Sequence, residues 1–148
     1  MPVPSPRRLL LTLRALSMLG LVLCLAACAT ATGRGDSLQR NQYAWSGAIR
    51  WGDFEGALNL VDPKVRAERP ITDVELGRYQ QVQISSYRDV GSDADVEAGT
   101  AARDVQIGVI NKHTQVERNV RYREQWRWDE ESGTWWLTTG LPDLWAGQ

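Results

Sequence analysis

Hydrophobic residues are unevenly spread along the 148-residue chain, and its first part differs from the rest. Residues 1–27 hold 17 of the 63 hydrophobic residues, in an apolar run over residues 9–25 that follows the basic pair Arg7 and Arg8. A basic start, an apolar run and small residues at its end are the three parts of an export signal. Arg14 interrupts the run, which is therefore shorter than the roughly 20 apolar residues of a membrane-spanning helix. The pattern predicts a cleaved signal peptide over residues 1–27.

The next part of the chain has apolar positions every three or four residues, which is the period of a helix packed on one side. We expect a first helix from Ser37 to Gly52, with Asp36 or Ser37 as its N-cap. Asp53 then caps a second helix. This helix is expected to end before Pro63, because the residue before a proline avoids the helical conformation.

Two further segments separate these helices from the second half of the chain. Residues 64–70 are polar and are interpreted as a connection. Thr72 is followed three residues later by Glu75, which is the spacing of a capping box. The pattern predicts a short third helix that runs from this cap toward Tyr79.

After Tyr79 the period of the hydrophobic pattern changes to two, which indicates β-strands. The predicted order is a strand from Val82, an acidic turn region over residues 91–97, and strands over residues 102–110, 116–128 and 134–139. In the third strand the even-numbered positions are mostly apolar and the odd-numbered ones are polar, so one face is dry and the other is wet. Helices followed by about four antiparallel strands predict an α+β fold, with the N-terminal helices packed on a curved sheet.

The composition of residues 28–148 fits one small domain. This part contains all seven Trp residues and has 14 basic against 18 acidic side chains. Its length is sufficient for one hydrophobic core, so we expect a single domain over residues 37–148. A weakly acidic chain without clustered positive charge argues against nucleic acid as a partner.

The end of the predicted signal peptide carries a specific tetrapeptide, Leu25-Ala26-Ala27-Cys28. It resembles the lipobox of bacterial lipoproteins, and this resemblance implies that Cys28 is lipidated and becomes the first residue of the mature chain. An ordinary signal-peptidase site beside an ordinary cysteine is the alternative. Ala29 follows the cysteine, which by the same resemblance implies an outer-membrane protein that faces the periplasm of the cell envelope.

Residues 28–36 are expected to form a flexible tether between the lipid and the domain. They show no hydrophobic period and contain two glycines. The eight residues 29–36 span roughly 16 Å as a random coil, so the domain is expected to lie close to the membrane.

The mature chain resembles the NTF2-like superfamily, and more narrowly its small bacterial lipoproteins. The resemblance rests on the two helices joined by Gly52-Asp53, the short third helix, and a final hairpin that pairs residues 125–128 with residues 133–137. It implies a cone-shaped fold that can enclose a pocket, in which some relatives use an acid or a histidine for proton transfer. A cystatin-like domain, with a helix on a sheet, is the alternative.

Polar residues interrupt the dry face of the third predicted strand and form a candidate pocket, which comprises Arg118, Tyr122, Glu124 and Trp126. In an apolar cavity Glu124 could act as a base, and Arg118 could bind an anion. The alternative is structural, since polar groups near the ends of strands often reach solvent or pair across the sheet.

Other chemistry has little support in the sequence. The usual catalytic and nucleotide-binding signatures are absent, and the single histidine, His113, falls in a predicted loop. We therefore expect no metal site and no cofactor. The Trp residues are expected to fill the core. Neighbouring strand residues face opposite ways, however, so either Trp135 or Trp136 should point outward and, with Trp145, could form a contact surface.

Taken together, these patterns predict a lipid-anchored envelope protein that binds a periplasmic protein or a small ligand and is not an enzyme. An isomerase or cyclase that uses a pocket carboxylate is the alternative. The wet face of the third strand carries Arg121 and Arg123. Because this face is highly charged, we expect a monomer or a weak dimer.

Overall fold

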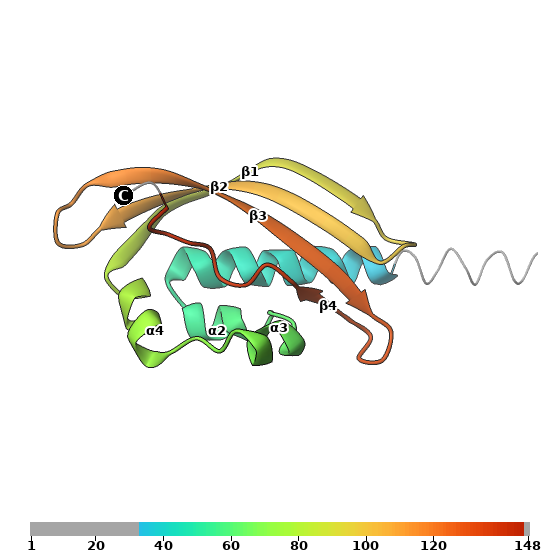
Figure 1. Cartoon of the computed structure of the whole chain (residues 1–148). Coiled ribbons are helices and arrows are strands. Elements are labelled where there is room, and N and C mark those ends of the chain that lie inside the picture. Colours follow the sequence, from blue (N-terminus) through green and yellow to red (C-terminus); the bar gives the residue numbers. More distant parts are fainter. Residues whose placement is uncertain (1–32, 147–148) are drawn as a thin grey trace, which may run out of the picture.

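The computed structural model describes residues 33–146, in which a curved antiparallel sheet covers a layer of helices (Figure 1). The sheet has the strand order β1-β2-β3-β4. The first described helix covers residues 33–51 and is followed by α2 (Phe54–Leu58), α3 (Pro63–Glu68) and α4 (Asp73–Tyr79). The strands are β1 (Val82–Asp95), β2 (Thr100–Asn111), β3 (Glu117–Asp129) and β4 (Thr134–Leu137). The predicted α+β class is confirmed. The predicted signal peptide, Cys28 and the first part of the tether lie outside the described residues.

The first described helix includes residues 33–36, so the predicted helix start at Ser37 is wrong. Arg34 forms a 2.7 Å ion pair with Glu130, and Trp135 Nε1 donates a 2.9 Å hydrogen bond to the Arg34 carbonyl oxygen. These contacts hold the start of the helix against the turn between β3 and β4. They join residues about 100 positions apart, which a local hydrophobic period cannot reveal. Residues 33–36 therefore belong to the domain and not to a flexible tether.

The predicted polar connection over residues 64–70 is also corrected, because most of it is the helix α3. Asp62 Oδ1 accepts a 2.9 Å hydrogen bond from the Lys64 amide and caps this helix. Pro63 occupies the first turn, where a backbone N–H has no hydrogen-bond partner within the helix, so the lack of an N–H in proline costs nothing there. The second helix does end before Pro63, as predicted, and the Asp-Pro pair also begins the next helix. The cap of α2 by Asp53 and the capping box of Thr72 and Glu75 are confirmed.

The acidic segment after residue 90 is a strand and not the predicted turn. β1 continues to Asp95, which pairs with Thr100 of β2, and the turn is confined to residues 96–99. β1 lies at the edge of the sheet, where its acidic side chains remain in water. Strand pairing therefore does not require the hydrophobic alternation that we used to find strands. The other strands agree with the prediction to within about two residues at each end.

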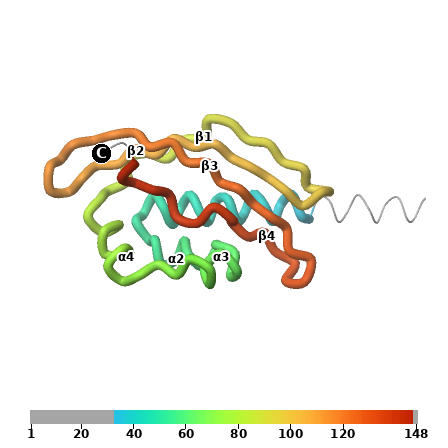
Figure 2. Tube along the Cα trace, viewed as in Figure 1, coloured from blue at the N-terminus to red at the C-terminus, as the bar shows by residue number. Residues whose placement is uncertain are grey.

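The chain between α2 and α3 is attached to β4 by backbone hydrogen bonds. Leu137 N–H donates to Leu60 at 2.9 Å, and Asp62 N–H donates to Leu137 at 2.8 Å. Figure 2 shows the C-terminal part of the chain running beside these helices. The largest fully buried side chains of the core include those of Trp45, Trp135, Ile49 and Leu137. The core therefore lies between the helix of residues 33–51, called the long helix below, and the inner face of the sheet.

Candidate functional site

Glu124 lies at the centre of a buried polar cluster on the inner face of the sheet. Its side chain has no exposed surface. Oε1 accepts hydrogen bonds from the Tyr87 hydroxyl and from Arg103 Nε and Nη2, the latter two at 3.1 and 2.8 Å. Oε2 accepts a 2.8 Å hydrogen bond from Trp126 Nε1. Both carboxylate oxygens are thus occupied by protein donors.

Arg103 provides the positive charge of this cluster. It pairs with Glu124 in the register of β2 and β3, and its Nη2 also donates to the Gln42 carbonyl oxygen of the long helix at 3.1 Å. Asp89 on β1 lies 3.6 Å away. Burial alone would lower the pKa of Arg103, but the hydrogen bonds and charge of Glu124 hold it above its usual value. The guanidinium therefore stays charged and neutralises the buried carboxylate.

Tyr87 completes the cluster from β1. Burial, followed by the neighbouring charge of Glu124, raises the pKa of the Tyr87 phenol far above its usual value of 10.0. The phenol stays protonated and donates to Glu124, while its oxygen accepts a 3.1 Å hydrogen bond from Trp45 Nε1. The cluster consequently links the long helix to β1, β2 and β3.

The candidate pocket residues lie on the inner side of the sheet, but they do not line a common cavity. Tyr122 bonds to the segment after β4, with its hydroxyl 2.8 Å from Thr139 Oγ1 and 2.5 Å from the Gly140 carbonyl oxygen. Its ring stacks on Trp45 at 6.3 Å, and Trp126 packs edge-on against Trp45 at 6.4 Å. These rings pack between the long helix and the inner face of the sheet.

Arg118 is directed toward the C-terminal segment and not toward Glu124. Its Nη2 donates a hydrogen bond to the backbone oxygen of Leu144, whose side chain is fully buried. Of the four candidates, the structure therefore joins Glu124 and Trp126 directly, whereas Arg118 and Tyr122 hold the segment that follows β4.

The sequence analysis missed the two donors that neutralise and bind Glu124. Arg103 precedes Val105, Ile107 and Val109, which alternate inward along the same strand, so its inward position could have been predicted. The inward position of Tyr87 could not have been predicted, because a register shift between Ile84 and Ser86 reverses the alternation of inward and outward side chains along β1.

Trp135 and Trp136 differ in burial as the alternation predicts, but the most exposed aromatic residues are not those that we expected. Trp135 is fully buried and Trp136 is half-buried, while Trp145 packs on the Tyr79 ring at 4.9 Å. Tyr43 and Trp51, by contrast, are 80% and 86% exposed on the long helix. The helix therefore presents the most exposed aromatic side chains of residues 33–146.

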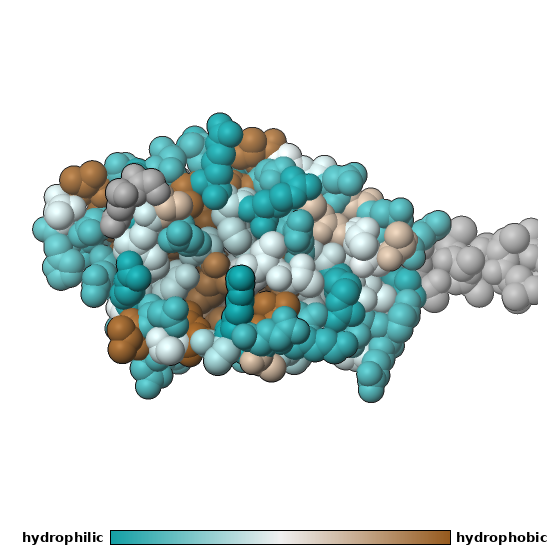
Figure 3. All heavy atoms as spheres, viewed as in Figure 1, coloured by the Kyte–Doolittle hydropathy of each residue, from teal (hydrophilic) through white to brown (hydrophobic). Residues whose placement is uncertain are grey.

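A groove of about 610 Å³ lies between α3, α4 and the segment after β4. Its apolar lining includes Val61, Val65 and Leu141. Arg66 and Arg69 also line it, and Arg66 Nε is buried without a hydrogen-bond partner. Figure 3 looks onto the side of the molecule where α3, α4 and this segment meet and shows apolar residues among hydrophilic ones. Glu68 and Glu75 line it as well, so the groove combines apolar surface with charges of both signs.

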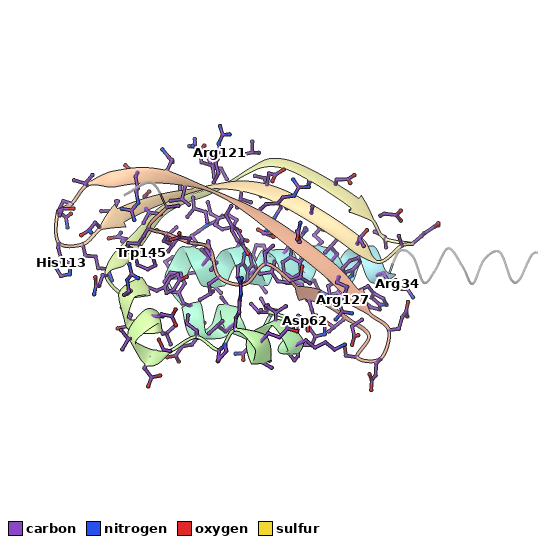
Figure 4. All side chains as sticks on the ribbon, viewed as in Figure 1. Arg34, Asp62, His113, Arg121, Arg127 and Trp145 are labelled. Carbon is purple, nitrogen blue, oxygen red and sulfur yellow. The ribbon has the colours of Figure 1, made fainter. Side chains whose placement is uncertain are left out.

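Two other expectations concern ions and membranes. His113 is exposed in the loop between β2 and β3, as Figure 4 shows. Within residues 33–146 no group of three or more His, Cys, Asp or Glu side chains is arranged to hold a metal ion. No helix in the same range has the length and apolar character needed to cross a membrane.

Comparison with known proteins gives information on the fold alone. No protein-family model and no curated protein matches the sequence. The chain is similar to the solution structure of a SEC-C motif containing protein from Rhodopseudomonas palustris, with a TM-score of 0.52 and 18% sequence identity. The match covers 66% of this chain and 71% of the other. The two proteins therefore share the general arrangement of helices on an antiparallel sheet.

Proposed function

We propose that the chain is an envelope lipoprotein, anchored through a lipidated Cys28, and that its domain binds a periplasmic protein or a small ligand without catalysing a reaction. The lipobox-like tetrapeptide supports the anchor. The helix already includes residue 33, and the five intervening steps from Cys28 span at most about 18 Å. The domain would therefore remain within a short distance of the lipid headgroups, facing the periplasm from the outer membrane.

The state of Glu124 is the observation that carries the non-enzymatic part of the proposal. A general base needs a lone pair within hydrogen-bond reach of the proton that it removes. Glu124 has no exposed surface and accepts four protein hydrogen bonds, so substrate does not reach it in this arrangement. These contacts favour a structural carboxylate over the isomerase or cyclase alternative.

We also propose an NTF2-like fold in preference to a cystatin-like one. α2 and α4 stand between the long helix and the sheet in the chain, where the NTF2-like resemblance implies a second and a short third helix, and α3 is an additional helix. The long helix lies against the inner face of the curved sheet (Figure 1). In this fold the aromatic packing around Trp45 would close the interior of the cone.

The groove between α3, α4 and the segment after β4 is the proposed binding region of the domain. Its volume is within the range of about 300–1,000 Å³ that is typical of ligand sites. The buried Arg66 Nε lacks a partner, and a ligand oxygen would satisfy it. The lining also carries Glu68 and Glu75, so a partner that places an oxygen acceptor at Arg66 beside an apolar group would fit it, whereas a strongly acidic partner would not.

Metabolic labelling with an alkyne analogue of palmitate tests the anchor. The wild-type chain should be labelled and the Cys28→Ala variant should not. Equal labelling of the two would contradict the lipoprotein proposal.

A pulldown from solubilised membranes tests the binding region. Arg69→Glu in the groove should reduce the recovery of the partner several-fold, whereas Arg121→Glu on the outer face of the sheet should not. Both side chains are exposed, so neither change should unfold the domain. Equal recovery with both variants would place the binding surface elsewhere.

A further inference from the structure

The long helix has an exposed stripe that packing within the domain leaves uncovered. The stripe is formed by Arg40, Tyr43, Ala44, Gly47, Arg50 and Trp51. All of these residues except the half-buried Gly47 are exposed. Their spacing of three and four residues places them along one side of the helix. We call this set the aromatic-arginine stripe.

The other side of the helix is fixed in the core. Leu38 is 6% exposed, and Trp45 and Ile49 are completely buried. The outward side of an amphipathic helix is usually polar, but here it carries the two large aromatic rings of Tyr43 and Trp51. Burying such side chains is favourable in proportion to their apolar area, so their nearly full exposure indicates a contact outside the domain.

The composition of the stripe is that of a membrane interface. Tyr and Trp combine an apolar ring with a polar group and are enriched at the level of lipid headgroups. Arg40 and Arg50 add positive charge, which attracts anionic phospholipids. The Arg50 guanidinium makes one 3.5 Å contact with the Tyr87 carbonyl oxygen and is otherwise directed to solvent. Ala44 and Gly47 between the rings leave room for close approach to a flat surface.

The place of the stripe in the chain favours a lipid surface over a protein partner. The described part of the helix starts at residue 33, five positions after the proposed lipidated Cys28, and residues 33–51 extend for about 27 Å from there. We propose that the helix lies flat on the membrane that holds the lipid anchor, with Tyr43 and Trp51 at the level of the headgroups. The membrane thus holds the domain at two points, the anchor near one end of the helix and Trp51 at the other. This inference rests on the proposed lipid anchor.

Three acids limit the positive charge of the stripe, and one of them, Asp89 of β1, lines a hollow together with Tyr43 and Arg50. Asp36 lies near its beginning, and Asp53 follows its end. Asp53 Oδ1 already accepts a 2.8 Å hydrogen bond from the Gly56 amide as the cap of α2. The attraction to anionic lipid is therefore modest, and the aromatic rings carry most of the contact. Salt should weaken the contact only in part.

A fluorescent label on the stripe tests the inference with the full lipidated protein. Both cysteines of the chain lie within the first 28 residues, and lipidation consumes the thiol of Cys28. A Cβ added at Gly47 meets no atom within 4 Å, so Gly47→Cys introduces a unique thiol without disturbing the fold. Arg121→Cys provides a matched control, because Arg121 points away from the helices on the outer face of the sheet (Figure 4). Each variant carries an environment-sensitive dye and is reconstituted into vesicles of phosphatidylethanolamine and phosphatidylglycerol.

The dye at position 47 should shift to shorter wavelength and be quenched by lipids with spin-labelled headgroups, whereas the dye at position 121 should do neither. Trp51→Ser in the Gly47→Cys background should remove most of this quenching. A protein that floats with the vesicles while both dyes remain in water would overturn the inference and leave the anchor intact. Shielding of position 47 only after an envelope protein is added would also overturn it, in favour of a protein contact. A protein that does not float would overturn the anchor and the inference together.

Discussion

Arg103 and Glu124 form a buried ion pair that crosses from β2 to β3. Arg103 Nη2 lies 2.8 Å from Glu124 Oε1, and the two side chains are 10% and 0% exposed. The residues are direct partners in the strand register. An isolated charge in this position would be strongly unfavourable, so Arg103 and Glu124 can be buried only as a pair. The pair fixes the sheet beneath the long helix, because Arg103 also donates to the Gln42 carbonyl oxygen.

Glu124→Gln should destabilise the domain by about 3 kcal/mol, because it leaves the charge of Arg103 without its buried partner. Asp89 remains 3.6 Å from Arg103, so the cost should lie at the low end of the range for breaking a buried ion pair. Urea unfolding followed by tryptophan fluorescence measures this loss.

Asp104→Asn is the matched control for that experiment. Asp104 and Arg123 are a 2.6 Å ion pair between the same two strands, but their side chains are about half exposed. Exposed pairs contribute less than about 1 kcal/mol, so this change should have little effect. If the two variants were equally stable, the structural role of Glu124 would be wrong and a functional role for the carboxylate would have to be reconsidered.

Local patterns were sufficient for much of the fold. The capping signals of Asp53 and Thr72 and the alternation of β3 each act within a few residues, and the structure confirms them. The errors arose where contacts between distant residues decide the outcome. The helix begins before Ser37 because Arg34 meets Glu130 across the domain. β1 continues through its acidic end because β2 supplies the hydrogen bonds.

The candidate site was predictable only in part, for the same physical reason. Alternation correctly placed Glu124 and Trp126 on the inner face of β3. It could not show that Tyr87, Arg103 and Trp126 together occupy both carboxylate oxygens, since those donors come from three strands. An inward-facing acid has the same sequence signature whether it is a catalyst or a structural residue. The number of its hydrogen bonds separates the two cases.

The stability of the domain should fall in acid partly through Asp62. Burial alone would raise the pKa of this carboxyl, but hydrogen bonds from Arg127 and the Lys64 amide hold it below its ordinary value of 3.8. The folded state therefore favours the charged form. Its contribution is complete above the unfolded-state pKa and is lost as the pH falls through the lower folded-state pKa.

Asp62→Asn isolates this contribution, because asparagine still caps α3. The variant should be less stable than the wild type at neutral pH, and the difference between their urea midpoints should shrink below pH 3.8. The pKa of Glu75 is also lowered, but this group is far from the substitution and cancels in the comparison, whereas Asp129 shares Arg127 with Asp62 and is tested separately by Asp129→Asn. A difference that stays constant into acid would show that the charge of Asp62 is not involved.

Truncation of the two tryptophans of the long helix should change the free energy of unfolding by very different amounts. Trp45 is fully buried and contacts the rings of Tyr122 and Trp126, so Trp45→Ala should cost about 3–5 kcal/mol. Trp51 is 86% exposed, so Trp51→Ala should change the free energy of unfolding by less than about 0.5 kcal/mol. Urea unfolding measures both. A large loss from Trp51→Ala would indicate that this ring packs on the domain and is not available to a membrane.

Two glycines should also respond oppositely to a methyl group. Gly77 lies within α4, and a Cβ there meets no atom within 4 Å, so Gly77→Ala should stabilise the domain by about 0.5–1 kcal/mol through its helix propensity. At Gly108 on β2 a Cβ would lie 2.3 Å from Ser85 Oγ, which is held by a 2.6 Å hydrogen bond to Glu117. Gly108→Ala should therefore destabilise by at least about 1 kcal/mol. Thermal unfolding of both variants checks the signs, and a stabilising Gly108→Ala would contradict this close packing of β1 on β2.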